Sequence, residues 1–167
     1  LSEHYTVFII NLRGAGKTDD QTDEYSYSMD DAIHDLEAVR HALNIEKWGF
    51  AGHSTGGFLA LKYSVMFPER LTKIIAGGLC ASGEYMYHPD SIYCKDNPNN
   101  KRMKEIFEEM RQPGTTRGQR IDLSKEWIMM SLYREEAYYE MLNRKMSGRT
   151  LVHKIDYFTS ELRDYDV

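Results

Sequence analysis

The sequence contains few cysteines and no long apolar run. Its 167 residues include two cysteines, Cys80 and Cys94, which are too few and too far apart for a disulfide framework or a paired-cysteine metal site. No apolar stretch approaches the roughly 18 residues that a membrane-spanning helix needs. We therefore expect no metal and no membrane partner, and a reducing, cytoplasmic setting. A secreted protein with one disulfide is the alternative.

Excess positive charge is also missing. The 26 acidic residues outnumber the 21 Lys and Arg residues, which gives a net charge of -5 at pH 7 and argues against nucleic acid as a partner. Hydrophobic residues make up 41% and charged residues 28%, as in ordinary globular proteins. Twelve Tyr, six Phe and two Trp provide large side chains to bury, so the composition argues against a chain that is disordered throughout.

The first half of the chain alternates apolar runs with amphipathic stretches. Short runs at Thr6–Leu12, Lys47–Ala51 and about Thr72–Gly78 are typical of parallel strands. Apolar residues at helical spacing predict helices over 29–43 and 55–67. Strands and helices that alternate in this way predict an α/β fold, with a parallel sheet of three strands and crossover helices.

The second half differs in composition: it is rich in Met and Tyr and shows no further strand pattern. We interpret residues 81–167 as an all-helical cap that leads back to the core, and residues 1–80 as a partial α/β core. The expected cap helices cover Met103–Met110, Trp127–Met146 in one or two pieces, and Leu151–Leu162.

The most informative motif is the run GHSTGG at Gly52–Gly57, which lies between a predicted strand and a predicted helix. A G-x-S-x-G pattern in this context predicts a sharp turn that exposes Ser54 in a strained conformation, with Gly52 and Gly56 leaving room for it. The backbone N–H of Thr55, at the helix start, can then donate to an oxyanion. Ser54 is the candidate nucleophile and Thr55 the candidate oxyanion donor.

A nucleotide-binding loop is a competing interpretation of Gly16-Lys17-Thr18. Such a loop needs G-x-x-x-x-G-K-[ST] followed by a helix. The first Gly would fall at Asn11, and acidic residues follow Thr18. Because of these departures, the sequence favours a serine enzyme over a nucleotide-binding protein.

Three runs together resemble one enzyme family. They are Asn11–Thr18, Gly52–Gly57 and Phe67–Arg70, and they resemble segments of α/β-hydrolases, most closely the prolyl iminopeptidase-like members with a helical cap. Asn11 stands where the family usually has Asp, which is mainly structural there. The resemblance covers Tyr5–Leu79 by motif and the cap by position and helical content.

The resemblance implies a serine hydrolase that attacks a peptide or ester carbonyl through an acyl-enzyme at Ser54. The implied activity is an aminopeptidase that releases N-terminal proline or a similar residue. The implied partner is a small-molecule or peptide substrate, no cofactor is implied, and the oligomeric state is left open. The alternatives are an esterase or lipase-like hydrolase, or a binding protein on the same fold that has lost catalysis.

Several family elements are not found in this sequence. In the family, an His-Gly loop that completes the oxyanion hole precedes this region, and the catalytic acid and histidine follow it. Some hydrolases place the acid after the sixth strand, where Glu84 and Asp90 lie here. Five histidines of this chain are expected to be surface or packing residues rather than the catalytic base. They are His34, His41, His53, His88 and His153.

The same resemblance predicts a gap in the sheet. In the family, a strand from an earlier region lies between those that Thr6–Leu12 and Lys47–Ala51 resemble. We infer that the chain is part of a longer protein.

Apolar and acidic side chains of the cap have two possible roles. Phe107, Trp127, Met130 and Tyr133 are expected to be structural first and substrate-lining second. The acidic group Glu135, Glu136 and Glu140 is expected to form a helical surface. No cap residue is assigned to substrate on this basis.

We expect these 167 residues, made alone, to be inefficient as a catalyst. A serine without its base keeps only about 10³–10⁴-fold catalysis over water, from binding and the oxyanion hole. The measurement is turnover of a chromogenic ester by the purified chain. Ser54-dependent turnover at ordinary enzyme rates would contradict this expectation.

Overall fold

The computed structural model describes residues 2–18, 27–143 and 160–167. The chain divides into two compact units. The first, which we call the core unit, comprises Leu1–Gly83 and Gly148–Val167. The second, the helical unit, comprises Glu84–Ser147. No helix in the described part of the chain is long and apolar enough to cross a membrane, and both cysteines are free thiols.

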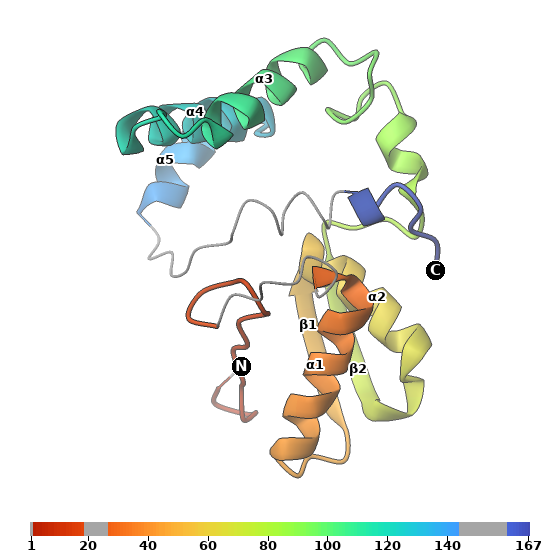
Figure 1. Cartoon of the computed structure of the whole chain (residues 1–167). Helices are drawn as coiled ribbons and strands as arrows, with labels where there is room; N and C mark the ends of the chain where they lie inside the picture. The colour runs from red at the N-terminus through yellow and green to blue at the C-terminus, as the bar shows by residue number, and fades with distance from the viewer. Residues whose placement is uncertain (1, 19–26, 144–159) are drawn as a thin grey trace. The chain divides into compact units, whose positions relative to one another are not determined.

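Two parallel strands form the sheet of the core unit (Figure 1). Strand β1 (Trp48–His53) pairs with β2 (Leu71–Gly77), in a register that sets His53 opposite Gly77. Helix α2 (Thr55–Met66) connects them, followed by the 3-10 helix η2 (Pro68–Arg70). A parallel pair requires such a crossover. The structure confirms the strands predicted at Lys47–Ala51 and about Thr72–Gly78, and it confirms that they are parallel. It also confirms the helix predicted over 55–67.

The third predicted strand, Thr6–Leu12, is wrong for this structure. Residues 6–12 form no strand, and Ile9 is 92% exposed. A strand needs a neighbour for its backbone N–H and C=O groups. The expected neighbour would lie between this segment and β1, and the described residues contain no such strand. The apolar run is present, but its pairing partner is not among them.

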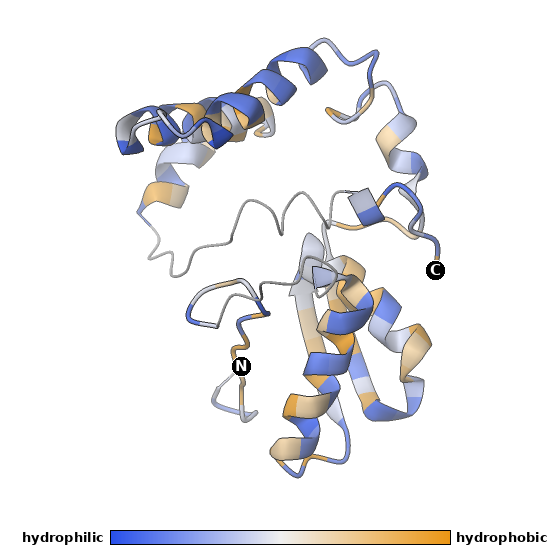
Figure 2. Ribbon diagram, in the orientation of Figure 1, coloured by the Kyte–Doolittle hydropathy of each residue, from blue (hydrophilic) through white to orange (hydrophobic). Residues whose placement is uncertain are grey.

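Helix α1 (Met29–Ala42) confirms the helix predicted over 29–43. Ser28 caps its start by accepting from the Asp31 N–H at 3.0 Å, which satisfies an otherwise unpaired donor. The helix ends before Asn44, which adopts a left-handed φ of 54°, a common way to stop a helix. Hydrophilic and hydrophobic residues alternate along α1 (Figure 2), and the buried ones include Ile33 and Leu36.

A partly buried polar network joins α1, β1 and α2. Arg40 donates from Nε and Nη2 to the Glu37 carboxylate at 2.9 and 2.7 Å. The Tyr63 hydroxyl donates to Glu37 and accepts from Trp48 Nε1 at 2.9 Å. The hydrogen bond from Arg40 is the main cause that lowers the pKa of Glu37. Each of these elements therefore contributes a partner that the others need.

The helical unit is built mainly from three α-helices. The 3-10 helix η3 (Gly83–Tyr87) spans the boundary with the core unit. The α-helices are α3 (Asn100–Arg111), α4 (Arg117–Met130) and α5 (Glu136–Leu142). Arg102 of α3 donates to both carboxylate oxygens of Glu126 of α4, at 2.6 and 2.8 Å. Beside this pair, the rings of Phe107 and Trp127 lie 5.4 Å apart. These contacts hold α3 against α4.

The predicted helices of this unit are confirmed in part. The helix expected at Met103–Met110 is α3. The helix expected from Trp127 begins earlier, at Arg117, where Thr116 and Gln119 form a capping box. It then breaks at residues 131–135 before α5. Residues 144–146 of that prediction lie outside the described residues, as does most of the helix predicted at Leu151–Leu162.

The Tyr63 hydroxyl should be important for stability. Tyr63→Phe removes the acceptor of Trp48 Nε1 and one donor to Glu37, and an unpaired buried polar group costs about 1–3 kcal/mol. Urea unfolding should therefore show a lower midpoint for Tyr63→Phe. Tyr87→Phe is the matched control, because Tyr87 is 68% exposed. Equal midpoints for the two variants would contradict the role assigned to the network.

Candidate active site

Ser54 occupies the turn between β1 and α2 in a strained conformation. Its φ and ψ are 55° and -119°, a left-handed region that non-glycine residues rarely adopt. Three backbone hydrogen bonds hold it: its N–H donates to Gly77 O at 2.9 Å, and its C=O accepts from Gly57 at 2.8 Å and Phe58 at 3.1 Å. Ser54 is exposed. The predicted strained turn is confirmed.

Glycine permits the close approach of α2 to β1. A Cβ built on Gly52 would lie 2.1 Å from Gly56 O and 2.8 Å from Gly56 Cα, so no side chain fits there. A Cβ on Gly57 would lie 2.6 Å from Gly77 O at the end of β2. The prediction that Gly52 leaves room is confirmed. For Gly56 it is wrong, because a Cβ there would meet no described atom within 4 Å.

Thr55 begins α2, so its backbone N–H has no acceptor within the helix. It also forms no hydrogen bond with the rest of the described chain. The N-terminal end of a helix carries partial positive charge, which favours an anion. An exposed hydroxyl on Ser54 and a free N–H on Thr55 therefore lie on consecutive residues. Together they offer a nucleophile and one donor for a developing oxyanion.

No described histidine forms a hydrogen bond with the Ser54 side chain. The ring of His53, the nearest in sequence, lies over the end of β2, because a Cβ built on Gly78 would be 2.8 Å from His53 Nε2. His34 lies against Phe67, with ring centroids 5.8 Å apart. His41 is exposed, and His88 Nδ1 is 3.7 Å from Asp90 Oδ2 on the surface. His153 lies outside the described residues.

The glycine-rich loop before residue 19 is anchored to α1. Arg13 donates from Nε and Nη2 to the Asp35 carboxylate at 2.6 and 2.5 Å, a two-point contact that fixes orientation as well as distance. The Arg13 side chain is only 20% exposed. The arginine of this motif therefore has a structural partner in the core unit.

The same loop does not provide a phosphate cradle. The Ala15 and Thr18 N–H groups already donate to backbone carbonyls, of Leu12 at 2.9 Å and Ala15 at 3.1 Å. Gly16 adopts a φ of 60°, and a Cβ there would lie 2.5 Å from the Asn11 side chain. A phosphate-binding loop needs such N–H groups to be free. The loop geometry disfavours the nucleotide-binding interpretation.

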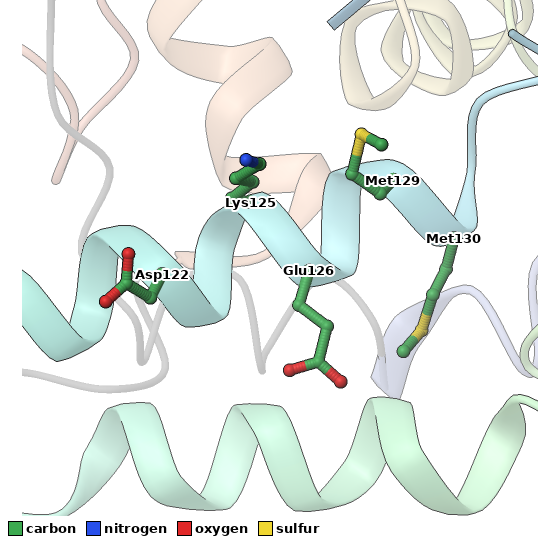
Figure 3. Close-up of a pocket in the computed structure, with 5 residues that line it drawn as sticks. All are labelled: Asp122, Lys125, Glu126, Met129 and Met130. Atoms are coloured by element: carbon green, nitrogen blue, oxygen red, sulfur yellow. The ribbon is translucent and has the colours of Figure 1, made fainter. Parts of the chain in front are cut away.

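A cavity of about 500 Å³ opens on α4 in the helical unit; it is lined by Asp122, Lys125, Glu126, Met129 and Met130 (Figure 3). Two of its charged side chains have structural partners. Glu126 points toward α3, where it binds Arg102, and Lys125 lies 5.5 Å from the ring centroid of Tyr138. The remaining wall is formed by Asp122 and the methionines.

The cap residues expected to be structural first and substrate-lining second have mixed outcomes. Met130 lines this cavity, whereas Phe107 and Trp127 pack on each other. Tyr133 is fully exposed. The expected acidic surface is confirmed, since Glu135, Glu136 and Glu140 are all exposed. Among the residues that the structure describes, no cluster of His, Cys, Asp and Glu could hold a metal ion.

The two glycines of the turn should respond in opposite ways to alanine. Gly52→Ala forces a Cβ into the Gly56 backbone, and overpacking of this kind typically destabilises by about 1–3 kcal/mol. Gly56→Ala meets open space within a helix, where alanine is favoured by about 0.5–1 kcal/mol. Thermal unfolding of both variants measures the difference. If Gly52→Ala were as stable as Gly56→Ala, the close approach would be wrong.

Comparison with known proteins agrees with this geometry. The model of the alpha/beta hydrolase fold family matches residues 1–166. An alpha/beta fold family hydrolase from Bacillus anthracis str. Sterne superposes with a TM-score of 0.86 at 47% identity, over 94% of this chain and 57% of that protein.

Curated relatives match over shorter stretches. A proline iminopeptidase of Xylella fastidiosa (strain 9a5c) is 31% identical over 77 residues, which is 46% of this chain and 25% of the relative. Epoxide hydrolase 4 of Mus musculus is 34% identical over 71 residues, 42% of this chain and 20% of the relative. The matches thus span a quarter or less of these two relatives. The family match over nearly the whole chain, together with the turn at Ser54, shows that this chain belongs to the alpha/beta hydrolase fold family.

Proposed function

We propose that this chain supplies the nucleophile of a serine hydrolase that forms an acyl-enzyme at Ser54. The observation that carries the proposal is the conformation of Ser54, exposed at a left-handed φ of 55° with the free Thr55 N–H beside it. Strain of this kind persists only where the surrounding contacts enforce it, and it is concentrated at functional sites.

The reaction begins with attack of Ser54 Oγ on a carbonyl carbon. The carbonyl oxygen gains negative charge, and the Thr55 N–H donates to it. Departure of the amine or alcohol leaves an ester on Ser54, which water then hydrolyses. A base must take the Ser54 proton and return it to the departing amine or alcohol. No described histidine forms a hydrogen bond with the Ser54 side chain, so the proposal requires that base to come from outside the described residues.

The serine also distinguishes between the activities named for the relatives. Attack of an alkoxide on an epoxide carbon would leave an ether, which water does not hydrolyse under mild conditions, and the enzyme would not turn over. Attack on a carbonyl leaves a hydrolysable ester. Ser54 therefore favours acyl transfer over epoxide opening, although one relative is named an epoxide hydrolase.

For the substrate, we propose a peptide with N-terminal proline or a similar residue. Several relatives named proline iminopeptidase support this class; one from Elizabethkingia meningoseptica matches over 65% of this chain at 30% identity. Simple esters are the second class, since the same acyl chemistry serves both. A panel of aminoacyl and short-ester chromogenic substrates on the complete protein separates the two.

Removing the Ser54 hydroxyl should abolish turnover in the complete protein. Ser54→Ala should lower kcat by about 10⁴-fold or more, because the acyl-enzyme cannot form. Ser131→Ala is the matched control, because Ser131 is an exposed serine in the other unit. Steady-state kinetics on the best substrate of the panel measures both variants.

A fluorophosphonate probe tests the nucleophile directly. Labelling of the complete protein should map to Ser54 by mass spectrometry and should disappear in Ser54→Ala. Absence of labelling in the folded wild-type protein would refute the enzyme and favour a binding protein on the same fold.

A further inference from the structure

The described segment after the helical unit, residues 160–167, is fastened to the core unit at several points. The Glu161 carboxylate accepts from the Met29 N–H at 2.9 Å, at the start of α1. Gly83 N–H donates to Tyr165 O at 2.8 Å, and Val167 N–H donates to Ala81 O at 3.1 Å. The last two bonds flank an antiparallel bridge between residues 82 and 166. Residues 81–83, where the chain leaves the core unit, are therefore paired with residues 165–167.

Tyr165 reaches from this segment into the core. It is 6% exposed, and its ring meets that of Phe58 edge-to-face, with centroids 5.1 Å apart. Its hydroxyl donates to Phe58 O at 2.9 Å, and that hydrogen bond is buried. Burial raises the pKa of Tyr165 to about 12, which favours the protonated hydroxyl that donates to Phe58 O.

Phe58 links this contact to the candidate nucleophile. It lies in the first turn of α2, and its own N–H donates to Ser54 O at 3.1 Å. One residue thus accepts from Tyr165 and donates to Ser54. A shift of this turn would move both the Ser54 hydroxyl and the Thr55 N–H. Displacements of about 1 Å at reacting groups can change rates by about 10²-fold.

We propose that Tyr165 is a positioning residue for Ser54, which holds the first turn of α2 through its ring contact and hydrogen bond to Phe58. This inference rests on the proposed acyl-transfer function. It predicts that the hydroxyl of a residue 111 positions away in sequence from Ser54 controls the rate of the chemical step rather than substrate binding.

The test compares Tyr165→Phe with Tyr87→Phe in the complete protein. Tyr165→Phe keeps the buried ring and removes only the hydroxyl, whereas Tyr87 is 68% exposed. We expect kcat to fall about 5–20-fold in Tyr165→Phe with KM within about twofold of wild type, and fluorophosphonate labelling at Ser54 to slow in parallel. If Tyr165 were only structural, Tyr165→Phe would lower the unfolding temperature. Its kcat, calculated per Ser54 that the fluorophosphonate can label, would then equal that of wild type. Equal kcat in the two variants would overturn the proposal.

A second pair of variants moves the segment without touching the tyrosine. A Cβ on Gly83 would lie 2.4 Å from Leu162 O and 2.7 Å from Arg163 O, so Gly83→Ala should push the segment away and reproduce the loss in kcat. Gly114→Ala is its control, because a Cβ there meets no described atom within 4 Å. Normal kcat in folded Gly83→Ala, with Tyr165 displaced from Phe58, would count against the proposal.

Amide hydrogen exchange separates this inference from the proposed function. If the fluorophosphonate does not label wild-type Ser54, the proposed function fails. Amide hydrogen exchange over residues 54–62 still measures how firmly the first turn of α2 is held. Faster exchange there in Tyr165→Phe than in Tyr87→Phe supports the positioning contact. Equal exchange in the two variants overturns it, whatever the activity.

Discussion

The core unit depends on the close contact between α2 and the end of β1 at Gly52. Because a Cβ on Gly52 would overlap the Gly56 backbone, the helix can begin directly above the strand only while this position lacks a side chain. The connecting turn then has one residue in which to reverse direction. That residue is Ser54, and its left-handed φ of 55° is the consequence. The position of the hydroxyl and of the Thr55 N–H follows from backbone packing rather than from any charged partner.

Such a turn persists only if α2 is fixed from several sides. Gly77 O accepts from the Ser54 N–H on the β2 side. The network of Glu37, Arg40, Tyr63 and Trp48 fixes the middle of the helix against α1 and β1. These contacts are neutral or internally paired, which suits a buried location where unpaired charge is costly. The strain at one residue is therefore offset by ordinary packing and hydrogen bonds spread along the helix.

Local patterns in the sequence were sufficient for most of these features. Periodicity located β1, β2, α1 and α2, and the G-x-S-x-G spacing located the strained serine, because each depends on neighbours within a few residues. Thr6–Leu12 was predicted wrongly since strand pairing is non-local, and an apolar run cannot report whether its partner is present. The start of α4 was missed although Thr116 and Gln119 carry a capping-box signal. The contact of Tyr165 with Phe58 spans too many residues for any spacing rule to reveal.

The turn at Ser54 and the α3–α4 pair are held by different kinds of contact. At Ser54 the hydrogen-bond partners are backbone groups of Gly57, Phe58 and Gly77, so substitutions elsewhere change the turn only by moving the backbone. In the helical unit, α3 and α4 are joined by side chains such as Arg102 and Glu126, and single substitutions can reshape the cavity on α4. Relatives named for peptide and for epoxide hydrolysis both match this chain. A turn held by backbone hydrogen bonds and a helical unit joined by side chains can change separately, so specificity can diverge while the turn is kept.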